Sequence, residues 1–101
     1  ILIFDDDGLV DVEGSYSFDE LLGYTVAVQG IGAAIQNLLL AATDRGLGTL
    51  WICDVVYAYS ELCEWLGEGH LMVAAVAVGH PDESPGPRPR KAVDEVTRWL
   101  T

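Results

Sequence analysis

The fold of this chain is decided by a long apolar run, VAVQGIGAAIQNLLLAA at residues 26–42. Apolar residues recur along it at the i, i+4, i+7, i+11 spacing of one helix face, which predicts a helix over residues 25–45. The stripe consists of Ile31, Ile35, Leu38 and Ala42. The other faces are also apolar or small, and a helix of that kind is expected to be buried nearly all round.

The expected length of this helix points to protein outside the chain. A helix of about 21 residues is roughly 31 Å long, whereas a compact domain of this size has a radius of gyration of only about 13 Å. Full burial therefore needs a further part of the domain, a second subunit, or both. The apolar run is shorter than a membrane span and is interrupted by Gln29, Gln36 and Asn37, so we interpret it as a core helix and expect no membrane contact.

Shorter elements flank this helix and indicate the fold class. Gly46 follows its last residues and suits the left-handed position that ends many helices. The other expected elements are strands at residues 1–4, 49–53 and 71–78, a second helix at residues 59–66, and loops at residues 8–20 and 79–90. The two later strands are continuous apolar runs, typical of strands covered on both faces. The alternation predicts an α/β or α+β sheet, and a chain that starts inside a strand is expected to be the C-terminal portion of one domain.

Composition excludes several classes of function. Sixteen Asp and Glu residues against five Lys and Arg give a formal net charge of −11, which disfavours binding to nucleic acid or to an anionic membrane. Cys53 and Cys63 lie in apolar company, so we expect reduced, buried thiols and a cytoplasmic protein. His70 and His80 have no partner at metal-ligand spacing and are expected in loops, so no metal is expected. No nucleophile motif is present, so we assign no catalytic side chain. Gly30 and Gly32 lie inside the predicted helix, where close packing is the favoured explanation rather than a dinucleotide site.

Two local features could bind a ligand. The strand at residues 49–53 ends with Ile52 and Cys53, and Asp54 follows it. Ligands in open sheets often lie beyond such carboxyl ends. For Trp51 and Ile52 the pattern alone favours a core role. Three of the five basic residues lie together in PRPRK at residues 87–91, which is either a stiffened phosphate clamp or a solvated turn that balances Asp94 and Glu95.

Taken together, these segments resemble the FMN-dependent nitroreductase family. The resemblance is carried by AAIQNLLLAA at residues 33–42, GLGTLWIC at residues 46–53, VGHPDE at residues 78–83 and RPRK at residues 88–91. Their order and spacing agree over residues 26–100. The resemblance implies an α+β subunit in which sheet and helices are layered, and an obligate homodimer with FMN at the subunit interface. The N-terminal Arg-Ser-x-Arg phosphate motif of the family does not occur in this chain.

The resemblance also implies site residues and a reaction. The cofactor-binding residues would be Trp51, Ile52, Cys53 and Asp54 at the strand end, whose backbone faces the isoalloxazine ring, together with Arg88 and Arg90 at the FMN phosphate. Hydride would pass from NAD(P)H to the flavin and then to a nitroaromatic or quinone-like acceptor. Many relatives carry small residues at the positions of Cys53 and Asp54. An acidic side chain beside the ring would disfavour the reduced anion of the flavin unless it points away.

Two questions stay open at this level. Residues 92–100 have the apolar spacing of a helix in Val93, Val96 and Leu100, whereas the resemblance implies an extended arm that crosses to the partner subunit near Thr97 to Leu100. The alternative to an oxidoreductase is a non-catalytic dimerisation module, or a degenerate fragment of a flavin-binding fold.

Overall fold

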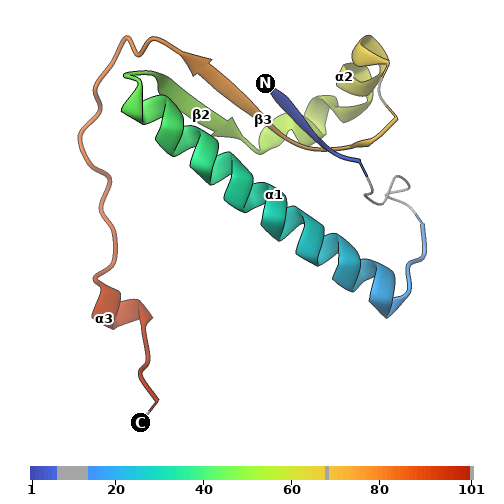
Figure 1. The fold of residues 1–101 in the computed structure, drawn as a ribbon, viewed down its shortest axis with the longest axis horizontal. Coiled ribbons are helices and arrows are strands. Elements are labelled where there is room, and N and C mark those ends of the chain that lie inside the picture. Colours follow the sequence, from blue (N-terminus) through green and yellow to red (C-terminus); the bar gives the residue numbers. More distant parts are fainter. Residues whose placement is uncertain (7–13, 68, 101) are drawn as a thin grey trace.

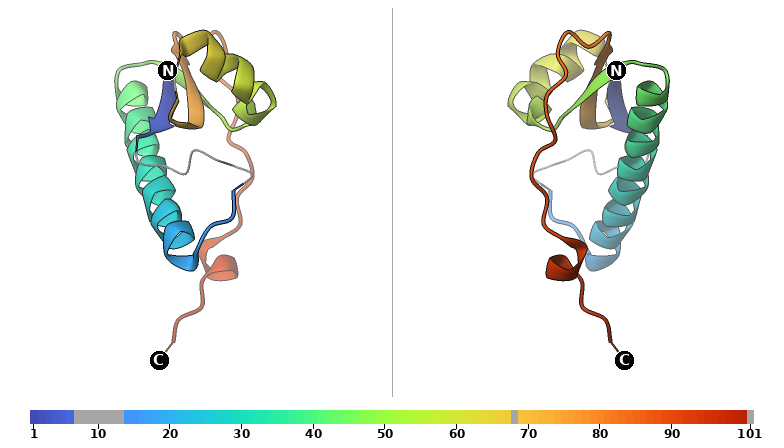
Figure 2. Two further views of the ribbon diagram at one scale, coloured as in Figure 1. Left: turned by 90° about the vertical axis from the view of Figure 1, so that its right-hand side faces the viewer. Right: turned by 90° about the vertical axis from the view of Figure 1, so that its left-hand side faces the viewer.

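A computed structural model describes residues 1–6, 14–67 and 69–100. Its centre is a three-stranded antiparallel sheet of β1 (Leu2–Asp5), β2 (Gly48–Ile52) and β3 (Leu71–Gly79), in the order β1-β3-β2. Helix α1 (Phe18–Asp44) lies on one face of the sheet, while the 3-10 helix η1 (Asp54–Ala58) and helix α2 (Tyr59–Leu66) lie on the other (Figures 1 and 2). Helices combined with an antiparallel sheet confirm the expected α+β class.

Helix α1 begins seven residues earlier than its apolar pattern predicts. Ser17 caps it with a capping box: the Ser17 hydroxyl accepts from the Glu20 backbone N–H at 3.3 Å, and the Glu20 carboxylate accepts from the Ser17 backbone N–H at 2.8 Å. The start of the helix therefore takes in residues 18–20 of the expected loop, and residues 8–13 of that loop lie outside the described part of the chain.

The end of α1 is where Gly46 predicted it. Gly46 has a φ of 70°, and its N–H donates to the Thr43 carbonyl at 3.0 Å, while the Leu47 N–H donates to the Ala42 carbonyl at 2.9 Å. These two bonds form a Schellman motif, which satisfies carbonyls at the helix end and turns the chain into β2. Gly67, with a φ of 69°, ends α2 in the same left-handed conformation.

The core forms on both faces of β3. On the α1 face, Ile35 packs with Ala74 and Val76, and these three residues are at most 2% exposed. On the other face, Val55 of η1 packs with Met72 and Ala75. Successive strand residues point to opposite faces, so Ala75 faces away from Ala74 and Val76. The register shift between Ile3 and Phe4, which pair with Ala74 and Met72, accounts for Met72 joining the cluster of Ala75.

Burial of α1 and β2 differs from the sequence-based prediction. Only Ile35 and Ala42 of α1 are buried, and Leu50 of β2 is 62% exposed. Covering both faces of β2, and α1 all round, would take protein that this chain does not supply. The radius of gyration is 17.1 Å, larger than the approximately 13 Å of a compact domain of this size. The accessible surface is 8303 Å², against about 5,600 Å² for a compact monomer of this mass.

The first half of α1 extends beyond the sheet, as Figure 1 shows. Phe18, Leu22 and Val26 are at least half exposed there. Within the described residues, this 27-residue helix is long and apolar enough to cross a membrane by length and composition alone, which the shorter predicted run is not. Core helices of soluble proteins pass the same test. Because Ile35 and Ala42 are packed against this chain's own sheet, we continue to interpret α1 as a core helix.

The C-terminal tail has only part of the predicted helix, and its crossing to a partner subunit stays a prediction. Residues 80–92 have no regular structure, and α3 (Val93–Val96) is a single helical turn. Thr97 is then in an extended conformation, and Trp99 and Leu100 are largely exposed. The tail runs away from the sheet along the outside of the molecule (Figure 1).

Candidate functional site

The carboxyl end of β2 is an exposed ledge of backbone, formed by Cys53 and Asp54. Ile52 is the last residue of β2 that pairs with β3, opposite Ala75. Cys53 and Asp54 follow it, are exposed, and lead into η1. β1 pairs with β3 beyond this level, as far as Asp5 opposite Leu71. The sheet is therefore one strand narrower beyond Ile52, and a ligand can approach the peptide groups there.

The side chains of Trp51 and Ile52 hold this strand in place and do not form the ledge. Trp51 packs in the α1 cluster, where its Cη2 lies 3.7 Å from the position that a Cβ would take on Gly32. Ile52 packs on the opposite face, against the η1 and α2 cluster. Both side chains therefore have the core role that the pattern alone favoured. Their part in cofactor binding, which concerns the backbone, stays a prediction.

One buried polar atom next to the ledge lacks a partner. The Trp51 Nε1 atom is buried and has no hydrogen-bond acceptor among the described residues. An indole N–H buried in this way normally finds an acceptor. Trp51 Nε1 is therefore an unsatisfied donor inside the α1 cluster of this chain.

The cysteines differ from their expected environment. Cys53 is exposed and Cys63 is half-buried, and both are free thiols. The prediction of a buried Cys53 was wrong because β2 ends one residue before it, so Cys53 leaves the apolar run that suggested burial. The ledge therefore includes an exposed cysteine, Cys53.

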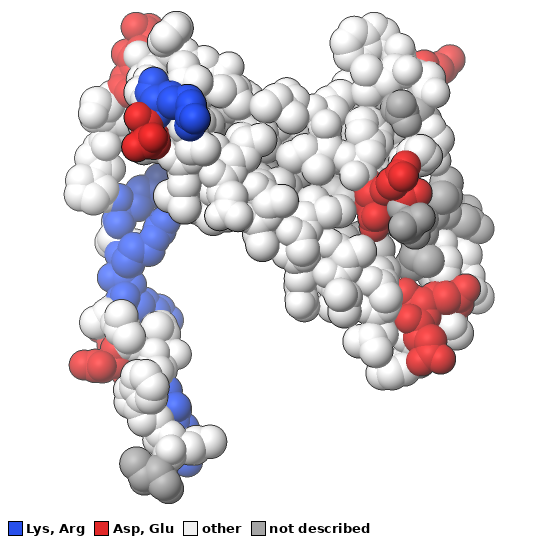
Figure 3. Space-filling view, in the orientation of Figure 1, with Lys and Arg blue, Asp and Glu red and all other residues white. Residues whose placement is uncertain are grey.

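The basic cluster of the tail is exposed, and the acidic residues Asp94 and Glu95 of α3 follow it closely in the chain. Arg88, Arg90 and Lys91 lie in the irregular segment between β3 and α3, seen as blue side chains along the tail in Figure 3. The Arg90 guanidinium donates only a long bond, 3.5 Å, to the carbonyl of Pro89. These cations are therefore available to an anionic ligand.

A single chain does not bring the ledge and the basic cluster together. The tail leaves the sheet after Gly79, which pairs with Gly48 at the start of β2, whereas the ledge follows Ile52 at its end. In Figure 1 the tail then continues away from the end of β2. Any common ligand would have to join the ledge of one chain to the tail of another.

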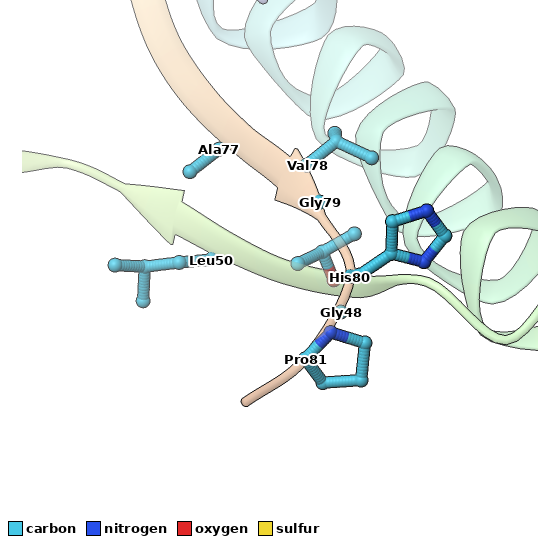
Figure 4. Close-up of a pocket in the computed structure, with 8 residues that line it drawn as sticks. Gly48, Leu50, Ala77, Val78, Gly79, His80 and Pro81 are labelled. Carbon is cyan, nitrogen blue, oxygen red and sulfur yellow. The ribbon is translucent and has the colours of Figure 1, made fainter. Parts of the chain in front are cut away.

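A surface hollow lies at the opposite end of β2 from the ledge. It has a volume of about 300 Å³ and is lined mostly by apolar atoms, including those of Leu50, Ala77 and Pro81 (Figure 4). Pro81 fits closely there because Gly48 has no side chain: a Cβ on Gly48 would lie 3.1 Å from the Pro81 Cβ. The continuous apolar runs that contain Leu50 and Ala77 gave no sequence signal for this hollow, because they indicated covered strands. None of the predicted site residues lines it.

The histidines occupy exposed positions outside the strands, as expected. His70 lies in the bend before β3, and its Nδ1 is 3.2 Å from an Asp6 carboxylate oxygen. His80 is exposed just after β3. In the part of the chain that the structure describes, no three potential metal ligands come together.

Comparison with known proteins agrees with this fold. The model of the Nitroreductase family matches residues 14–80, which run from the start of α1 through β3. An NADPH-flavin oxidoreductase of Vibrio harveyi is 34% identical over 82 residues. That alignment covers 79% of this chain and 32% of the relative, so the chain spans about a third of the relative's length. On the strength of the family match across its long helix, sheet and ledge, this chain belongs to the nitroreductase family.

Proposed function

We propose that this chain is part of an FMN-dependent oxidoreductase that passes hydride from NAD(P)H through the flavin to a nitroaromatic or quinone-like acceptor. The observation that carries the proposal is the exposed backbone ledge at Cys53 and Asp54, in a chain that belongs to the nitroreductase family. The similarity to an enzyme named for NADPH and flavin supports the choice of cofactor and donor.

The ledge suits the edge of a planar heterocycle. Peptide N–H groups past the last pairing of β2 can donate to ring nitrogen and oxygen atoms, and Cys53 and Asp54 are exposed there. Donors fixed in this way stabilise charge that develops on a bound ring. Trp51 and Ile52 would serve by anchoring the strand from both faces of the sheet.

The basic cluster suits the phosphate of the same cofactor. Arg88 and Arg90 are exposed guanidinium groups, which bind phosphate oxygens through charged hydrogen bonds. Because the tail and the ledge of one chain diverge, we propose a homodimer in which one subunit supplies the ledge and the other the arginines. The exposed apolar face of α1, with Leu22, Val26 and Leu40, is the proposed contact between subunits.

The proposed reaction assigns different roles to the flavin and to the protein. When bound, the flavin supplies the hydride chemistry, and the protein supplies position and electrostatics. The ledge orients the ring, the arginines fix the phosphate, and the neighbouring subunit excludes water from the ring. No acidic or basic side chain is needed at the reacting atom, which agrees with a sequence that carries no recognisable catalytic motif.

The test uses the protein at its natural full length. We expect the purified protein to be yellow with FMN and to oxidise NADPH in the presence of a quinone. The double variant Arg88→Ala and Arg90→Ala should weaken FMN binding by at least about a hundredfold, since each charged hydrogen bond to phosphate contributes roughly 1.5–3 kcal/mol. Arg45→Ala, which removes one positive charge at the end of α1, should leave FMN binding unchanged.

Two results would contradict the proposal. A colourless protein that forms a stable dimer but takes up no FMN would instead support the non-catalytic dimerisation module. Equal loss of FMN binding in the Arg45→Ala protein would show that net charge, rather than the clamp, is responsible.

A further inference from the structure

Asp54 carries a negative charge that its own part of the chain does not balance. It is exposed, stands at the start of η1, and directly follows the ledge residue Cys53. No Lys or Arg occurs between residues 46 and 87, a segment that includes β2, η1, α2 and β3. Among the described residues, His70 pairs with Asp6 and not with Asp54.

A carboxylate at this place acts on a bound ring through its charge. Reduction adds electrons to the ring, so a fixed anion nearby disfavours the reduced form relative to the oxidised form. The effect grows as the site is closed to water, because charges interact more strongly at low dielectric. The basic cluster of the same chain does not cancel it, since the tail leaves the sheet at the opposite end of β2. In the proposed dimer the arginines of the neighbouring subunit are assigned to the FMN phosphate and not to the ring.

We propose that the Asp54 carboxylate lowers the reduction potential of the flavin held at the ledge, and so biases the enzyme toward giving up electrons to its acceptor. This inference rests on the proposed function. It assigns to Asp54 a tuning role on the redox equilibrium, in addition to the binding provided by the backbone of the ledge.

Asp54 also has a plausible structural role, which the test must separate. An acidic residue in the first turn of a helix is favourable because backbone N–H groups there are unpaired. Loss of that role would lower the stability of η1 without shifting the equilibrium between oxidised and reduced flavin. The reduction potential is therefore the informative measurement.

The experiment compares neutral and charged variants of the full-length, FMN-loaded protein by spectroscopic redox titration. Asp54→Asn should shift the equilibrium about tenfold toward reduced flavin, which raises a two-electron potential by about 30 mV. Asp54→Ser, which keeps a short oxygen-bearing side chain for η1, should give the same shift. Asp54→Glu, which keeps the charge, should stay within about twofold of the unmodified protein.

Asp82→Asn is the matched control, because it removes an exposed carboxylate in the loop after β3 and changes net charge equally. It should leave the potential unchanged. A shift below about twofold in both neutral variants of Asp54 would overturn the inference, as would an equal shift in Asp82→Asn.

A second measurement separates this inference from the proposed function. Around a thermodynamic cycle, the neutral variants must bind reduced FMN more tightly, relative to oxidised FMN, by the same factor as the redox shift. If the unmodified protein binds no FMN, the proposed function fails and the inference with it. If FMN binds normally and the ratio of the two affinities is the same in all variants, only the role of Asp54 fails.

Discussion

The two halves of helix α1 have opposite surroundings, although both are apolar. The second half lies on the sheet, where Ile35 is 2% exposed and packs with Ala74 and Val76. The first half extends beyond the sheet, and Phe18 is 77% exposed. An apolar sequence therefore indicates that a helix is buried in the complete protein, but it does not say which part of the protein buries it. The described part of this chain packs against only the second half of α1.

The largest expected effect comes from the packed half. Ile35→Ala should lower the free energy of unfolding by about 2–5 kcal/mol, because it opens a cavity between α1 and β3. Denaturant unfolding of the full-length protein measures this loss. A loss of unfolding free energy below about 1 kcal/mol would contradict the contrast between the two halves. It would mean that the surroundings of residue 35 close the cavity or that Ile35 is not part of the core.

The unpacked half should respond through assembly. Val26 is 62% exposed and lies opposite Ile35 on the helix, so Val26→Asp should weaken the proposed dimer by at least about tenfold. Sedimentation over a range of protein concentrations measures the change. Thr25→Asp adds the same charge to a lateral position and should have little effect. A Val26→Asp protein that dimerises normally would mean that another segment covers this face.

A substitution at Gly46, where the packed half of α1 ends, should have a smaller effect on stability. Gly46 has a φ of 70°, so Gly46→Ala should cost about 1 kcal/mol of stability through backbone strain alone. No neighbouring atom lies within 4 Å of the added Cβ. Thermal unfolding tests this, with Gly23→Ala inside α1 as the comparison, which should be neutral or stabilising. Equal losses in both proteins would contradict the left-handed helix end.

The smallest effect should come from the capping box at the start of the unpacked half. Hydrogen bonds from the Ser17 hydroxyl and the Ser17 backbone hold the pKa of Glu20 below its ordinary value of 4.5. A carboxyl whose pKa is lower in the folded state stabilises that state above its unfolded pKa. This contribution is lost as the pH falls through the folded value. The protection of the amides of residues 18–21, taken as their exchange rate relative to an unstructured peptide at the same pH, should therefore fall on acidification below about pH 4.5, and Glu20→Gln should abolish that dependence.

Local chemistry predicted the elements well. The helix end at Gly46, the stop at Gly67 and the strand that begins at Leu71 follow from glycine conformation and from continuous apolar runs. The start of α1 was placed too late because the apolar stripe begins after the cap, although Ser17 and Glu20 carry a readable capping signal. The α+β class followed from the order of the elements.

Burial and the ledge were harder to predict. A continuous apolar strand such as β2 looks the same whether its cover comes from its own chain or from another, so Leu50 was wrongly expected to be covered. The exposure of Cys53 depends on a strand boundary displaced by one residue. The distance between the ledge and Arg88 could not be predicted because it depends on which end of β2 the tail leaves.

The step in the sheet at Ile52 has a consequence for how such a protein can change through evolution. Since the ledge consists of main-chain groups, any amino acid other than proline at positions 53 and 54 keeps its hydrogen-bonding capacity. Substitutions at these two positions can alter charge, thiol chemistry or acceptor preference while the ledge itself is kept. An insertion or deletion within β2 is different. It would shift the register by one residue, exchange the side chains that face the two sides of the sheet, and abolish the ledge.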